Sequence, residues 1–171
     1  MLPESAKTDV QGIILYAYGH MEAASYLMLR IQDVALAKGW LKEISEKLTY
    51  AAGKKAEKSI NLAFTKAGLV RLGLPEKVME TFPRPFIEGM TLEHKARGFG
   101  DLGENAPDQW DWGHEPKGKE IHMVLMLYAE NQTILDEYQS KQITKLDLSG
   151  IQVIQQLDTE PFMHKTRKEH F

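Results

Sequence analysis

The sequence contains no cysteine among its 171 residues. This absence excludes disulfides, thiolate-ligated zinc, iron–sulfur clusters and a cysteine nucleophile. Long hydrophobic runs are also missing, since the longest, Met123 to Ala129, is far shorter than the roughly 20 residues of a membrane-spanning helix. The segment from Met1 to Val10 is polar and shows no basic stretch followed by an apolar one, so no signal peptide is expected. We therefore expect a cytoplasmic protein with no membrane partner.

An excess of positive charge is absent too, because the formal net charge is −3. Proteins that bind nucleic acid usually present a basic surface, so no nucleic-acid partner is expected. Lysines do gather between residues 38 and 58, and we interpret them as a solvated helix face. With 43% hydrophobic and 26% charged residues, the composition is typical of an ordinary globular domain.

The order of apolar segments predicts a ferredoxin-like fold. Four segments have the composition or alternation of buried strands: Tyr26–Ile31, Ser59–Thr65, Ile121–Tyr128 and Ile151–Leu157. Two segments, 33–48 and 131–146, have apolar residues at helical spacing, and Asp33 and Asn131 can cap them. The order strand, helix, strand, strand, helix, strand is that of an α+β fold of the βαββαβ type, a four-stranded antiparallel sheet with two helices on one face.

The other segments complete a single domain over residues 1–171. An N-terminal arm over about residues 1–20 contains Gln11–Tyr18, which is either an additional strand or a packed extended segment. A helical and loop insertion, residues 66–118, separates the second and third strands. Within it we expect a helix over Phe86–Arg97 and an ordered loop over Gly98–Gly118 that is rich in Gly, Pro, Asp and Asn. No further element is expected in the tail, residues 160–171.

No side-chain pattern in the sequence defines an active site. The six histidines have no spacing typical of a metal site, and we interpret them as surface or edge residues; they are His20, His94, His114, His122, His164 and His170. Two carboxylate pairs lie in the loop, Asp101 with Glu104 and Asp108 with Asp111. Such pairs can perform acid–base catalysis or hold a cation, but the surrounding Gly and Pro favour turns and helix caps. Trp110 and Trp112 can stack on a ligand, although we favour a role in anchoring the loop to the core.

Several stretches, taken together in their order, are similar to one known family. They are Val10–Leu15, Leu62–Leu69, Leu72–Pro75, Phe86–Met90, and Leu102–Pro107 followed by Trp110. The first departs slightly, because Ile13 stands where the family usually has asparagine. Over essentially its whole length the chain resembles the N-terminal, ferredoxin-like domain of the DyP-type (dye-decolourising) haem peroxidases.

The resemblance implies an enzyme that oxidises dyes or phenolic compounds with hydrogen peroxide and haem b. In the family, a segment like Lys168–Phe171 runs into a Gly-x-x-Asp-Gly motif that supplies the distal acid. The distal arginine and the histidine that ligates the haem iron follow later, in a second ferredoxin-like domain. Because this chain stops at Phe171, we expect no catalytic, cofactor-binding or metal residue in it. We likewise expect that haem does not bind specifically to this chain alone.

Other interpretations remain open. The chain can be an excised domain or a natural, truncated relative without catalysis. It can also be a stand-alone ferredoxin-like protein that pairs two sheets in a dimer and binds haem or a small ligand. Both the peroxidase and the dimer hypotheses predict an exposed apolar sheet face. The expected partner on that face is the second peroxidase domain in one case and a second copy of the chain in the other.

Overall fold

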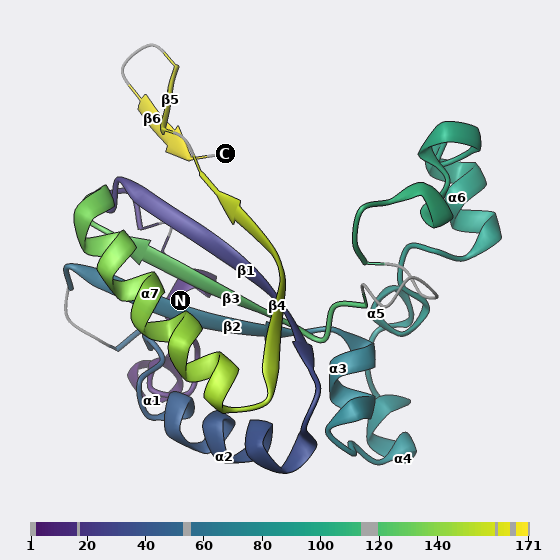
Figure 1. Cartoon of the computed structure of the whole chain (residues 1–171), viewed down its shortest axis with the longest axis horizontal. Coiled ribbons are helices and arrows are strands. Elements are labelled where there is room, and N and C mark those ends of the chain that lie inside the picture. Colours follow the sequence, from purple (N-terminus) through teal and green to yellow (C-terminus); the bar gives the residue numbers. More distant parts are fainter. Residues whose placement is uncertain are drawn as a thin grey trace.

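The computed structural model describes residues 3–16, 18–52, 56–113, 120–159, 161–164 and 167–170. Its centre is an antiparallel sheet of four strands in the order β2-β3-β1-β4 (Figure 1). These strands are β1 (Ala23–Ile31), β2 (Lys58–Phe64), β3 (Met123–Ala129) and β4 (Ile151–Asp158). Every pairing between them is antiparallel. The predicted α+β, ferredoxin-like fold is therefore confirmed.

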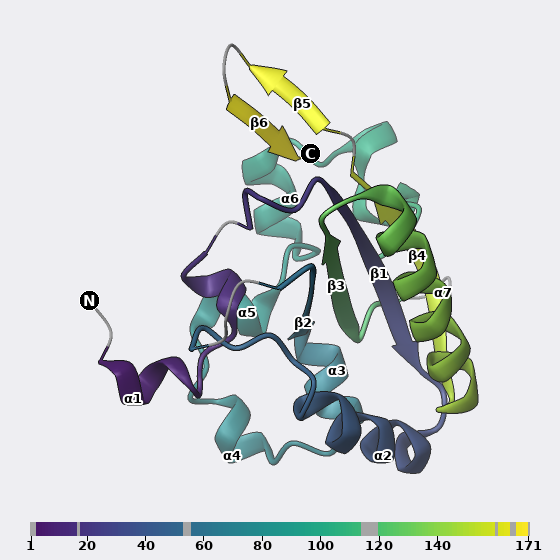
Figure 2. The same ribbon diagram turned by 90° about the vertical axis from the view of Figure 1, so that its left-hand side faces the viewer.

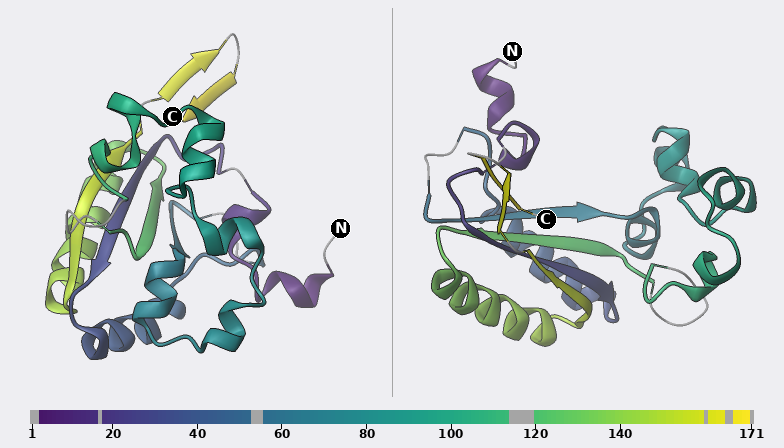
Figure 3. Two further views of the ribbon diagram at one scale, coloured as in Figure 1. Left: turned by 90° about the vertical axis from the view of Figure 1, so that its right-hand side faces the viewer. Right: turned by 90° about the horizontal axis from the view of Figure 1, so that it is seen from above.

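Helices α2 (Val34–Ser45) and α7 (Gln132–Leu148) cover one face of this sheet (Figure 3, right). Both begin at the predicted caps. The Asp33 carboxylate accepts a hydrogen bond from the Leu36 N–H at 3.0 Å, and the Asn131 side-chain oxygen accepts one from the Ile134 N–H at 3.0 Å. These bonds satisfy backbone donors that have no partner inside the first turn of a helix.

The main core lies between the sheet and these two helices. It combines alternate residues of the strands, such as Leu27, Leu29 and Leu125, with Trp40 and Ile44 of α2. All five are at most 4% exposed, so the predicted apolar stripe of α2 faces the sheet. Side chains on one face recur with a period of two in a strand and of about 3.6 in a helix. The spacing of apolar residues therefore predicts which side of each strand and helix faces the core.

The N-terminal arm forms a helix, α1 (Glu4–Lys7), and a 3-10 turn over Gly12–Ile14, so it adds no strand to the sheet (Figure 2). Gln11 nevertheless completes the outer edge of β2. Its side-chain oxygen accepts from the Leu62 N–H at 2.8 Å, and its side-chain N–H donates to the Leu62 carbonyl at 2.8 Å. One amide side chain thus occupies backbone groups that would otherwise remain unpaired on an edge strand.

The sheet face opposite α2 and α7 is less exposed than we expected. Tyr18 of the arm and Met21, which follows the arm, pack there against Ala24 and Tyr128. All four residues are buried. The Tyr18 hydroxyl donates to the Asn61 side-chain oxygen at 3.0 Å. None of the large exposed hydrophobic side chains among the described residues lies on β1–β4. The arm therefore fills part of the face that we had predicted to be bare.

The insertion between β2 and β3 is a row of short helices that extends beyond the end of the sheet (Figure 1). They are α3 (Lys66–Arg71), α4 (Glu76–Met79), α5 (Arg84–Glu88) and α6 (Glu93–Phe99), followed by 3-10 turns over Gly103–Asn105 and Pro107–Gln109. The predicted single helix over Phe86–Arg97 is wrong. Gly89 interrupts it with a φ of +66°, a left-handed conformation that glycine adopts without strain.

The tail also differs from the prediction, which contained no element after residue 160. Strands β5 (Pro161–His164) and β6 (Arg167–His170) pair with each other as an antiparallel hairpin. The hairpin follows β4 but forms a sheet of its own, separate from the central one (Figure 1).

Candidate functional site

The start of α3 is fixed against the segment that leads into β3. The Thr65 hydroxyl accepts from the Gly68 N–H at 3.0 Å and thereby caps α3. The same hydroxyl lies 2.7 Å from the Ile121 carbonyl oxygen, to which it donates, while the Thr65 N–H donates to the His122 carbonyl at 3.1 Å. Gly68 allows this approach, since a Cβ at that position would lie 1.9 Å from the His122 carbonyl oxygen.

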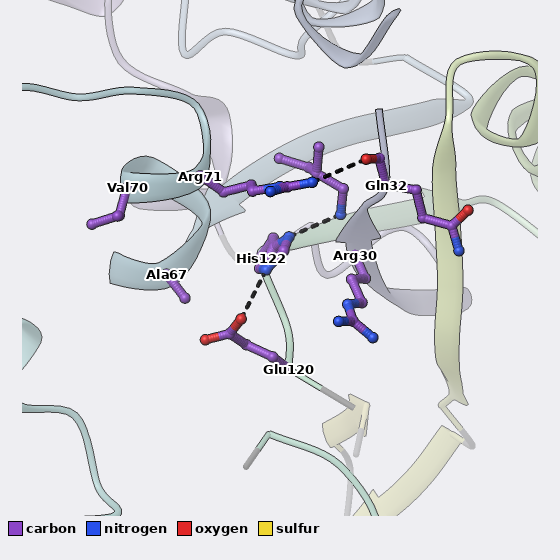
Figure 4. Close-up of a pocket in the computed structure, with 8 residues that line it drawn as sticks. Arg30, Gln32, Ala67, Val70, Arg71, Glu120 and His122 are labelled. Atoms are coloured by element: carbon purple, nitrogen blue, oxygen red, sulfur yellow. Dashed lines mark hydrogen bonds and ion pairs between the residues drawn. The ribbon is translucent and has the colours of Figure 1, made fainter. Parts of the chain in front are cut away.

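His122 is held by both of its ring nitrogens. Nδ1 accepts a hydrogen bond from the Ile31 N–H at 2.9 Å, and Nε2 lies 3.1 Å from a carboxylate oxygen of Glu120 (Figure 4). A backbone N–H can only donate, so Nδ1 carries no proton and Nε2–H donates to Glu120. The imidazole is therefore neutral and oriented, with a side chain that is 5% exposed. The sequence interpretation of His122 as an edge residue missed this burial.

A cavity of about 530 Å³ opens beside this histidine, between the end of β1 and α3. Arg30 of β1 and Arg71 of α3 line it together with Glu120 (Figure 4). The Arg71 guanidinium donates to the Gln32 carbonyl at 3.1 Å, which fixes its position at the rim. The rest of the wall is mainly apolar and consists of Ile31, Ala67 and Val70.

A second cavity, of about 710 Å³, lies under the insertion and shares Ala67 and Glu120 with the first. Phe86, Trp110 and Trp112 form much of its aromatic wall. The Trp110 ring N–H donates to the Asn105 carbonyl at 3.0 Å, a bond within the loop itself, so anchoring of the loop to the core stays a prediction. Because both tryptophans also face a cavity, the stacking interpretation remains open.

Glu88 at the edge of this second cavity has ionic contacts with two basic side chains. The Arg84 guanidinium donates to it, and the Lys95 ammonium lies 3.2 Å away. These hydrogen bonds, that of Arg84 first, hold the pKa of Glu88 below its ordinary value. Glu88 therefore stays ionised and cannot serve as an acid near neutral pH.

The remaining candidates from the sequence do not come together. His20 lies 3.3 Å from the Ala56 carbonyl oxygen, and His94 is 59% exposed beside Glu88. His114, and the side chains of His164 in β5 and His170 in β6, lie outside the described part of the chain. Within the described residues, no three His, Asp or Glu side chains gather closely enough to hold a metal ion. This holds for the loop carboxylates Asp101, Glu104, Asp108 and Asp111 as well.

The fold and the DyP-like stretches define a class, a ferredoxin-like α+β domain with a helical insertion. The family model described as the DyP dimeric alpha+beta barrel domain matches residues 9–161. This match covers most of the chain, so the chain belongs to that family. A comparison with curated proteins finds no match.

Solved structures agree with this assignment. The DyP-type peroxidase of Anabaena sp. superposes with a TM-score of 0.79 at 19% identity, over 98% of this chain and 37% of that one. The enzyme of Auricularia auricula-judae gives 0.72 at 20%, over 94% and 35%. A dye-decolourising peroxidase solved with 2,6-dimethoxyphenol gives 0.68 at 22%, over 92% and 35%. Likeness at such identities shows the fold, and the chain spans about a third of the length of these proteins.

Two of the described histidines are not placed as iron ligands in this structure. A haem ligand must offer a ring nitrogen to the metal. Both nitrogens of His122 are already hydrogen-bonded, and His94 projects into solvent.

None of the described helices is long and apolar enough to cross a membrane.

Proposed function

We propose that this chain serves as the N-terminal domain of a haem peroxidase that oxidises dyes or phenolic compounds with hydrogen peroxide. The observation that carries the proposal is the family match over residues 9–161. The solved relatives are peroxidases about three times as long as the matched region, and one was solved with a phenol, 2,6-dimethoxyphenol. Haem b is the cofactor that this function requires in the whole enzyme.

In this proposal, the chain alone neither holds haem in a defined site nor turns over peroxide. Peroxidase chemistry needs an axial ligand on the iron and polar groups over its distal face. His122, which lines a cavity, offers no ring nitrogen to a metal, because both are engaged by Ile31 and Glu120. The catalytic groups are then supplied by a second domain.

The proposed docking surface is the middle of the sheet face opposite α2 and α7. Tyr26, Val124 and Met126 are half-buried there, and the arm does not reach far enough to bury them fully. A second peroxidase domain packs on this strip in the full enzyme, with residues 160–171 leading toward it. In this layout residues 1–20 are an arm and residues 66–118 an insertion within one domain.

Haem titration into the purified 171-residue chain tests the proposal. We expect a broad Soret band that does not saturate at one haem per chain, and no peroxide-dependent bleaching of a dye. Supplying a second DyP domain as a separate polypeptide should produce a sharp Soret band and activity. A sharp, saturable one-to-one spectrum with dye bleaching by the chain alone would contradict the proposal.

The family description names a dimeric domain, and this favours a second candidate, a homodimer that pairs two sheets. The mass in solution separates the two candidates. A monomer that binds the second domain supports the peroxidase proposal. A stable dimer that excludes that domain supports the alternative. A cytoplasmic location is part of either proposal and can be checked by cell fractionation.

A further inference from the structure

We propose that the cavity between β1 and α3 binds a small molecule through its carboxylate or phosphate group, with Arg30 and Arg71 as the anion-binding side chains. The inference does not depend on the peroxidase function, because it rests on residues of this chain alone.

The two arginines reach the cavity from elements far apart in sequence. Arg30 is the next-to-last residue of β1, and Arg71 is the last residue of α3. The Arg71 guanidinium is already positioned by its bond to the Gln32 carbonyl at 3.1 Å. A guanidinium has five N–H donors in a planar fork, so one such bond leaves donors that match the two oxygens of a carboxylate or phosphate. Figure 4 shows the two side chains on either side of His122.

The charges in the cavity wall favour an anion. The described lining residues include two guanidinium groups and one carboxylate, Glu120, and His122 adds no charge because Nδ1 accepts from Ile31. The Glu120 carboxylate is itself engaged by the His122 Nε2–H at 3.1 Å. An excess of positive charge among the described residues of a concave, partly apolar site favours small anions.

The size and the apolar wall indicate a small organic anion. A volume of about 530 Å³ lies within the range of small-molecule sites. Ile31, Ala67 and Val70 offer an apolar surface beside the guanidinium groups. Since both nitrogens of His122 are engaged, this histidine is not available as a base, and the arrangement of the described lining residues suits binding more than acid–base catalysis.

The test is a titration of the isotopically labelled 171-residue chain with acetate and, separately, with inorganic phosphate, followed by NMR at low ionic strength. We expect saturable shifts at the Arg30 and Arg71 side chains and at the Gln32 and His122 amides. The probe that binds more tightly identifies the group that the site prefers. If neither probe saturates, or if the shifts spread evenly over surface arginines, the proposal is wrong.

Four variants separate a built site from general charge. Arg71→Gln should weaken binding by about tenfold or more, because a charge-assisted hydrogen bond is lost. Arg71→Lys, which keeps the charge but not the fork, should fall in between. Arg97→Gln makes the same change in net charge on the distant helix α6, where Arg97 faces Glu93, and should leave binding unchanged.

Glu120→Gln gives the sharpest result. The amide oxygen still accepts from His122, while the negative charge in the cavity disappears, so anion binding should become tighter. Unchanged melting temperatures verify that each variant folds, and Arg71 is exposed enough for its replacement to be tolerated. Equal weakening by Arg97→Gln and Arg71→Gln, or weaker binding in Glu120→Gln, would overturn the proposal.

Discussion

Gly68→Ala should be among the most damaging small substitutions in this chain. A Cβ at this position would lie 1.9 Å from the carbonyl oxygen of His122 and 2.7 Å from its carbonyl carbon. Both are backbone atoms, so no side chain can rotate away, and α3 must move from the start of β3. That movement also strains the bonds from Thr65 to the Ile121 and His122 carbonyls.

The expected cost is about 3 kcal/mol, about 2 from overpacking and about 1 from the weakened Thr65 hydrogen bonds. For a chain of this length, that corresponds to a fall of roughly 6–12 °C in Tm. Differential scanning calorimetry or urea unfolding measures it. Gly39→Ala is the matched control, because Gly39 lies inside α2 with no atom near its Cβ position. That change should instead raise the stability by about 1 kcal/mol. Equal shifts in both variants would refute the reasoning.

Three further outcomes are expected. Trp40→Ala should lower the free energy of unfolding by about 3–5 kcal/mol, because a large side chain in the main core is lost. Lys42→Ala, on the exposed side of α2, should change it by no more than about 0.5 kcal/mol. Similar melting shifts in the two variants would show that the helix faces the other way. Gln11→Ala should cost about 1–2 kcal/mol and speed hydrogen exchange at the Leu62 amide. Burial raises the pKa of Tyr138 from 10.0 to about 12, so its neutral form stabilises the fold below pH 10 and loses this effect as the pH rises through 12. The stability of Tyr138→Phe should therefore fall less steeply than that of the natural chain over this interval.

The sequence was sufficient to predict the core that lies between the sheet and its two helices. Asp33 caps α2 through a neighbour three residues away, and Trp40 and Ile44 follow a helical period, so both features are local. The opposite sheet face was not predictable in this way. Asn61 lies between Ile60 and Leu62, on the face of β2 away from the helices, yet it is fully buried, and the hydroxyl of Tyr18, 43 residues earlier, donates to it.

The cavity residues escaped the sequence analysis for the same reason. The bond from Ile31 to His122 spans 91 residues, and no spacing within either segment indicates it. Arg30 has the pattern of an ordinary charged residue at the end of a strand. A signal was present in one place: Thr65 and Gly68 belong to the stretch Leu62–Leu69 that carries the family resemblance. The structure gives this stretch a physical role, because its threonine and glycine bring α3 against His122.

The same contact fixes the fold and shapes the cavity, and this coupling can be measured. Gly68 and Arg71 lie three residues apart on α3, so a shift of the helix away from His122 also displaces the guanidinium. Gly68→Ala should therefore weaken acetate or phosphate binding even well below its melting temperature, where the chain is folded. Trp40→Ala is comparably destabilising, but Trp40 belongs to α2 and does not line the cavity, so below its own melting temperature this variant should bind the anion normally. Equal loss of binding in the two variants would mean that the anion responds to global stability, and the link between the α3 contact and the cavity would fail.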